Sequence, residues 1–165
     1  HDRAGIATVQ PMTEKEYAVG GMTALIDAIG VTIHRISETH KLTAEDERPE
    51  KVMFVVITDG AENASREYRA EQVQQMIERQ KAASDWEFIF LGANIDAVKT
   101  AGRIGIAPDR AQNYHADKAG VALNFEAMSS AVTSFRTAGT RGRSSGEAWP
   151  RNSSPSSISK RTPEP

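Results

Sequence analysis

The clearest pattern along the chain is an unbroken apolar run over residues 52–57, which is followed by Thr58, Asp59 and Gly60. A run of this length without alternating polar residues predicts a strand buried on both faces, as in the centre of a parallel sheet covered by helices. In open α/β sheets, ligands bind outside the carboxyl ends of the strands. Asp59 is therefore predicted to lie at a ligand-binding edge of the sheet.

Helical and extended patterns alternate around this run. Apolar residues at helical spacing predict a helix that begins at or just after Thr23 and carries Leu25, Ile29, Ile33 and Ile36. Further strands are expected over residues 86–91 and 111–115, and residues 6–9 fit a short strand end. Strands that alternate with helices predict an α/β protein with a Rossmann-like parallel sheet, right-handed crossovers and helices on both faces.

Three more helices complete this pattern, and their caps can be proposed from the sequence. A helix over residues 66–83, capped by Asn63 or Ser65, should bury Val73, Met76 and Ile77. A short helix ending near residue 103 should be capped by Asn94 or Asp96. Asp117 should cap a last helix, whose apolar residues are Val121, Leu123, Phe125, Met128, Val132 and Phe135.

The chain of 165 residues has room for one domain. Residues 1–19 are interpreted as a leader or edge segment, and residues 20–136 as the α/β domain. Residues 137–165 are rich in Ser, Pro, Gly and Arg, with Trp149 and Ile158 as the large apolar residues. We expect this tail to be disordered, because it cannot bury enough apolar surface to offset its ordering entropy.

Composition excludes several classes of function. A formal net charge of -2 gives no global case for binding nucleic acid or an anionic membrane, and the absence of cysteine excludes disulfides and thiolate metal sites. No apolar run approaches the about 20 residues that span a bilayer. A cytoplasmic location fits these properties.

Two short motifs together resemble a known family. Gly20-Gly21-Met22-Thr23-Ala24-Leu25 opens a helix, and Thr58-Asp59-Gly60 ends a buried strand. In order and context they resemble the von Willebrand factor A domain, whose metal-ion-dependent adhesion site uses a loop threonine and a strand-end aspartate. The resemblance covers most of residues 20–136, and residues 88–94 and 113–117 look like a bacterial and phage subgroup of stand-alone A domains.

The resemblance implies that Thr23 and Asp59 are metal ligands. Neighbouring residues would line the rim of the site or support the ligands: Gly21, Asp27, Gly60, Glu62 and Asn63. Mg²⁺ prefers about six oxygen ligands and keeps several waters, so a hydroxyl and a carboxylate on neighbouring loops suit it, with Mn²⁺ or Ca²⁺ as substitutes. An open coordination position would accept a carboxylate from a partner protein.

The family's remaining ligands come from an Asp-x-Ser-x-Ser loop, a pattern that this sequence lacks. We therefore expect an A domain that is truncated before its second strand, with weak or absent metal binding. The missing strand would lie beside residues 52–57, so this strand would become an edge and promote self-association.

Two other functions stay open at the level of the sequence. One is a metal-dependent hydrolase or phosphotransferase that uses Asp59 as a metal ligand, although no catalytic motif accompanies this residue. The other is an inactive gene fragment. Phosphoester turnover would favour the enzyme, and metal-dependent capture of a protein without turnover would favour the binding module.

Overall fold

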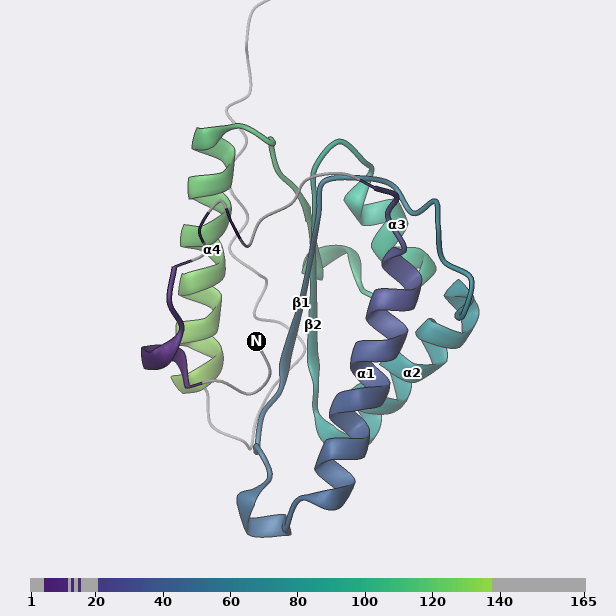
Figure 1. Ribbon diagram of the computed structural model, residues 1–165, viewed down its shortest axis with the longest axis vertical. Helices are drawn as coiled ribbons and strands as arrows, with labels where there is room; N and C mark the ends of the chain where they lie inside the picture. The colour runs from purple at the N-terminus through teal and green to yellow at the C-terminus, as the bar shows by residue number, and fades with distance from the viewer. Residues whose placement is uncertain (1–4, 12, 14, 16–20, 138–165) are drawn as a thin grey trace, which may run out of the picture.

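The computed structural model describes residues 5–11, 13, 15 and 21–137 as an α/β fold built on a three-stranded parallel sheet (Figure 1). The strands are β1 (Met53–Thr58), β2 (Glu87–Gly92) and β3 (Ala111–Asn113), in the order β1-β2-β3. Met53 of β1 lies opposite Glu87 of β2, and Phe90 of β2 lies opposite Ala111 of β3. The predicted α/β class and parallel sheet are confirmed.

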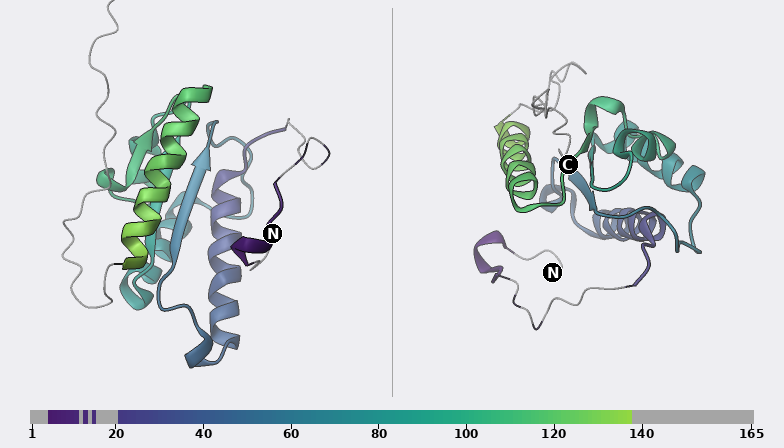
Figure 2. Two further views of the ribbon diagram at one scale, coloured as in Figure 1. Left: turned by 90° about the vertical axis from the view of Figure 1, so that its left-hand side faces the viewer. Right: turned by 90° about the horizontal axis from the view of Figure 1, so that it is seen from above.

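Helices cover both faces of this sheet. On one face lie α1 (Leu25–Leu42), α2 (Ala70–Ser84) and α3 (Ala97–Arg103), and on the other lies α4 (Lys118–Thr137) (Figures 1 and 2). Three 3-10 turns, η1 (Ile6–Thr8), η2 (Glu45–Glu47) and η3 (Pro108–Arg110), complete the described elements. The arrangement is compatible with a Rossmann-like fold.

The apolar core consists of two clusters separated by the sheet. The larger one joins the three-helix face to Val56, Phe88 and Phe90, and the smaller one joins Ile89 and Leu91 to α4. All residues of β2 from Phe88 onwards are buried, so β2 is the central strand. Successive side chains of a strand point to opposite faces, which is why β2 contributes to both clusters.

Strand β1 is less buried than the central strand β2. Among the described residues it pairs only with β2, and it is an edge strand. Its first three residues are partly exposed, and Ile57 is 45% exposed. Both faces of β1 are covered, as its apolar run predicts, but its side chains stay partly exposed because β1 lies at the edge. An edge position was expected because the sequence lacks the segment that would lie beside it.

Several element boundaries also differ from expectation. Residues 6–9 form the turn η1 instead of a strand end. The helix predicted to begin at residue 66 begins at Ala70, and Arg69 is its N-cap in place of Asn63 or Ser65. Asp96 and Asp117 do cap α3 and α4, since they accept hydrogen bonds from Lys99 N (3.0 Å) and Gly120 N (2.7 Å).

Helix α4 packs on the sheet through its buried residues Asn124, Ala127, Ala131 and Phe135. Of the apolar residues that the sequence analysis named on this helix, four are exposed: Val121, Leu123, Phe125 and Val132. Of the predicted set, Phe135 is buried and Met128 packs against the smaller cluster.

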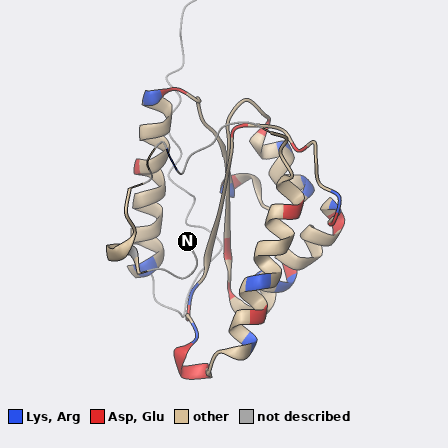
Figure 3. Cartoon of the chain, viewed as in Figure 1, with Lys and Arg blue, Asp and Glu red and all other residues tan. Residues whose placement is uncertain are grey.

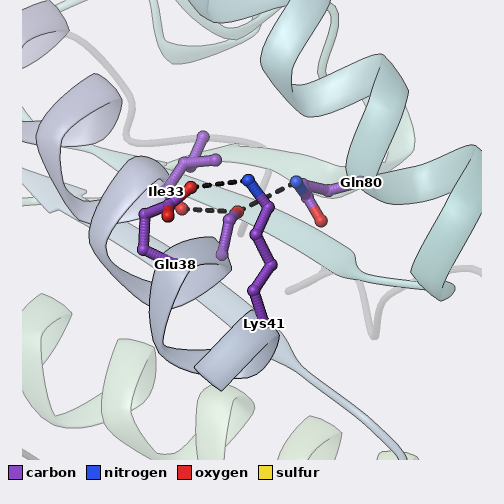
Figure 4. A network of polar contacts seen from close by, with 5 residues as sticks. Ile33, Glu38, Lys41 and Gln80 are labelled. Carbon is purple, nitrogen blue, oxygen red and sulfur yellow. Dashed lines mark hydrogen bonds and ion pairs between the residues drawn. The ribbon is translucent and has the colours of Figure 1, made fainter. Parts of the chain in front are cut away.

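Polar contacts reinforce the packing of α1 against α2 (Figure 4). Gln80 Nε2 donates to Ser37 Oγ (3.0 Å), which in turn donates to the Ile33 carbonyl (2.7 Å). Lys41 Nζ donates to Glu38 Oε1 on the same helix (2.6 Å). Acidic and basic residues are otherwise mixed along the helices and loops (Figure 3).

Two predictions lie wholly or largely outside the described residues. They are the leader over residues 1–19 and the disordered tail over residues 137–165, of which Thr137 ends α4. Within the described part of the chain, no helix combines the length and apolar character needed to cross a membrane.

Candidate functional site at the carboxyl ends of the strands

A tight turn presents Asp59 at the end of β1. The Thr58 hydroxyl donates to the Gly60 carbonyl (2.9 Å) and accepts from Gly60 N (3.3 Å). Thr58 is buried, whereas Asp59 is exposed. The chain thus fixes the turn through Thr58 and leaves the Asp59 carboxylate facing solvent.

The structure brings Thr23 to the same turn from 36 residues earlier in the sequence. A Cβ atom placed on Gly60 would lie 3.2 Å from Thr23 Oγ1, so the hydroxyl lies directly against this glycine. Thr23 and Asn63 also exchange two hydrogen bonds: Thr23 N donates to Asn63 Oδ1 (2.8 Å), and Asn63 N donates to the Thr23 carbonyl (3.0 Å). Thr23 and the Asp59-Gly60 turn are therefore neighbours on one rim.

Glu62 holds the beginning of α1. Its Oε2 accepts from Ile26 N (2.9 Å) and from the Ser65 hydroxyl (2.8 Å), while its Oε1 accepts from Ala64 N (3.0 Å) and Ser65 N (2.7 Å). Ser65 Oγ in turn accepts from Asp27 N (3.0 Å). Side chains of the 60–69 loop thus bind backbone N–H groups in the first turn of α1, which otherwise lack partners.

Asp27 makes the reciprocal contact from α1 to the loop. Its carboxylate accepts from Arg66 N (2.7 Å), Glu67 N (2.9 Å) and Tyr68 N (2.8 Å). The Tyr68 ring then lies against Gly30 of α1, where an added Cβ would come within 2.6 Å of it. Asp27 and Glu62 together fasten the 60–69 loop to α1.

Hydrogen bonds lower the pKa of the Glu62 and Asp27 carboxyl groups. Burial acts to raise the pKa of Glu62, but the bonds from Ile26, Ser65 and Ala64 outweigh it, and the pKa lies below the ordinary 4.5. Burial acts in the same direction on Asp27, and its three backbone partners likewise bring its pKa below 3.8. These groups position the rim, and their lone pairs already have donors.

The sequence analysis assigned no ligand role to Asn94 and Tyr114, which lie close to Asp59. Asn94, in the left-handed conformation (φ 58°), donates from Nδ2 to the Asp59 carbonyl (3.3 Å). Tyr114 follows β3, and burial together with the nearby Asp59 charge raises the pKa of its phenol. Their positions directly after β2 and β3 are the sequence signal that could have identified them.

The remaining predicted rim residues lie around the turn. Gly21 is exposed and has a positive φ of 101°, which suits the glycine that leads into Thr23. Gly60 contacts Thr23 as described, and Asn63 is bound to the Thr23 backbone. The structure thus gathers Thr23, Asp59, Gly60, Glu62 and Asn63 at the carboxyl end of β1.

The described residues alone do not form a complete metal site. They contain no group of three or more His, Asp or Glu side chains placed to hold an ion. The Thr23 hydroxyl and the Asp59 carboxylate can supply oxygen ligands, but Asp27 and Glu62 bind backbone N–H groups. A tightly held hard cation would require further oxygen ligands beyond this set.

Comparisons with known proteins identify no relative. No family model matches the chain, and neither a curated protein nor a solved structure does so.

Proposed function

We propose that this chain carries part of a protein-binding module resembling a von Willebrand factor A domain. The module would capture a carboxylate of a partner protein through a divalent cation at the carboxyl end of β1. Thr23 and Asp59 would be ligands of Mg²⁺, for which Mn²⁺ or Ca²⁺ could substitute. The observation that carries this proposal is the contact of the Thr23 hydroxyl with the Asp59-Gly60 turn.

The local design of the rim supports this proposal. Asp59 is exposed and carries charge at the edge of the sheet where α/β proteins bind ligands. Asp27 and Glu62 fix the loop without occupying Asp59. The rim can therefore offer a preorganised hydroxyl and a carboxylate to a hard cation.

The proposed site is incomplete in this chain. Its remaining protein ligands would come from a segment with the Asp-x-Ser-x-Ser pattern, which the sequence lacks. Water would fill the other positions, as Mg²⁺ commonly allows. We therefore expect millimolar rather than micromolar affinity for the cation.

Paramagnetic broadening by Mn²⁺ tests this site even when binding is weak. Titration of the full chain with Mn²⁺ should broaden the amide resonances of Thr23, Asp59 and Gly60 first. Asp59→Asn should remove this selective broadening because it removes the charged ligand. Asp46→Asn, in the exposed turn η2 before β1, is the matched control and should leave it unchanged.

Three results would contradict the proposal. Broadening centred elsewhere, or unchanged in Asp59→Asn, would remove the cation from this rim. Mg²⁺-dependent hydrolysis of 4-nitrophenyl phosphate that Asp59→Asn abolishes would instead favour a metal-dependent hydrolase.

A further inference from the structure

Within the described part of the chain, the outer edge of β1 is not protected by charges, by proline or by a paired strand. Met53–Thr58 contains no charged residue and no proline. Among the described residues, no strand pairs with this edge. Natural sheets commonly block such edges with charges, proline, bulges or covering segments, because unpaired strand edges are templates for another chain.

The hydrogen bonds to β2 show which backbone groups of β1 point outwards. Glu87 N donates to the Val52 carbonyl (2.9 Å), and Ala93 N donates to the Thr58 carbonyl (2.8 Å). Backbone groups alternate in direction along a strand, so the even-numbered residues of β1 face β2. Met53, Val55 and Ile57 therefore direct their N–H and C=O groups to the open edge.

We infer that this edge binds a second copy of the chain. The two β1 strands run antiparallel, with Val55 on the two-fold axis. Val55 then faces Val55 of the second copy, and Met53 faces Ile57 of the second copy. These are all residues with outward backbone groups, so each opposed pair can exchange two hydrogen bonds.

The side chains favour this register over its neighbours. This register places Phe54 of each copy opposite Val56 of the other, and it covers the exposed Ile57 with Met53 of the other copy. It also places Lys51 of each copy opposite Asp59 of the other. Opposite charges across a strand pair stabilise the pair. Shifting the axis to Phe54 would set Lys51 opposite Ile57, and shifting it to Val56 would set Asp59 opposite Met53.

The layers on each side of the sheet also match under this symmetry. Met53 and Val55 pack on the α4 side, whereas Phe54 and Val56 pack on the other side. Residues that face one another across the axis share a side, so α4 of both copies covers the same face of a continuous sheet. Lys51 Nζ donates to the Phe135 carbonyl of α4 (3.0 Å), so its ammonium also lies on the α4 side.

Sedimentation velocity on the full chain tests this interface. The wild type should sediment as a dimer at micromolar concentration, and chelation of metal should not weaken the dimer, because the paired backbone groups of β1 bind no cation. Ile57→Lys should lose the dimer, since it places a charge opposite Met53. Leu123→Lys, an exposed position on α4 (51%), is the matched control and should remain a dimer.

A charge exchange tests the register itself. Lys51→Asp and Asp59→Lys should each weaken the dimer, because like charges then face one another twice. An equimolar mixture of the two variants should form a one-to-one heterodimer in which both pairs are again opposite. Circular dichroism of each variant would show whether the fold is retained.

Three results would overturn the inference. They are a monomeric wild type, a dimer that survives Ile57→Lys, and a mixture of folded charge variants that associates no better than its components.

Discussion

At the scale of single residues, the candidate site depends on Asp27 and Glu62, whose side chains fasten the 60–69 loop to α1. Each carboxylate accepts hydrogen bonds across about 40 positions of sequence, such as Asp27 from Tyr68 (separation 41) and Glu62 from Ile26 (separation 36). A sequence pattern assigned them only to the surroundings of the site. Apart from the Ser65 hydroxyl, their partners are backbone N–H groups, which every residue except proline carries, so composition could not reveal them.

These two carboxylates predict a loss of stability in acid. Their pKa values are below the ordinary 3.8 and 4.5 in the folded chain, so their contribution is fully present above pH 4.5. It declines as the pH falls through the folded-state pKa values, because the folded chain then takes up protons less readily than the unfolded chain. The free energy of unfolding should therefore fall with acidification in this window.

Glu62→Gln isolates one part of this effect. The amide keeps an acceptor oxygen but cannot ionise, and we expect a loss of about 1 kcal/mol at neutral pH, since charge-assisted bonds are stronger than neutral ones and partial exposure moderates the difference. Urea unfolding at several pH values should show a shallower acid dependence than in the wild type. An equal dependence of the free energy of unfolding on pH in the variant and the wild type would contradict the role assigned to Glu62.

At the scale of elements, the sequence predicts existence and type better than boundaries or orientation. The apolar run and the following glycine identified β1 and β2, because strand patterns are local. The start of α2 was placed four residues early, since Asp27 of α1 binds the N–H groups of residues 66–68, a contact that the local sequence does not show. The sequence did not indicate which face of α4 is buried, because apolar residues lie on several sides of this helix.

Asn124 shows the consequence of that orientation for stability. Asn124 is 3% exposed. Among the buried side-chain oxygen and nitrogen atoms of the described residues, its Oδ1 lacks a hydrogen-bond partner. Asn124→Leu should therefore raise the free energy of unfolding by about 1 kcal/mol, because an unsatisfied buried polar group is costly.

Helix propensity alone would also favour leucine over asparagine, by a few tenths of a kcal/mol. Ser130→Leu, at an exposed position of α4, measures that contribution separately. A gain at Asn124 no larger than the gain at Ser130 would show that the buried oxygen has no energetic cost.

At the scale of the whole molecule, the described residues form a three-stranded parallel sheet in which β2 is the central strand and β1 lies at one edge. The sequence predicted the class, the order of elements and a polar rim containing Thr23 and Asp59. It could not place Tyr114 and Asn94 around Asp59, since their proximity follows from the alignment of three strands. The edge position of β1 was expected from the resemblance and the missing segment, whereas the residues of β1 alone do not encode which strands pair.

The central claim is that the rim at Asp59 binds carboxylates through a divalent cation. Titration with acetate, followed by the amide shifts of Thr23 and Gly60, tests this most directly. With millimolar Mg²⁺ present, acetate should shift both resonances in a saturable manner, and Asp59→Asn should abolish the effect. Without Mg²⁺, acetate should leave them unchanged. Equal shifts with and without Mg²⁺, or no shifts at saturating Mg²⁺, would contradict the claim.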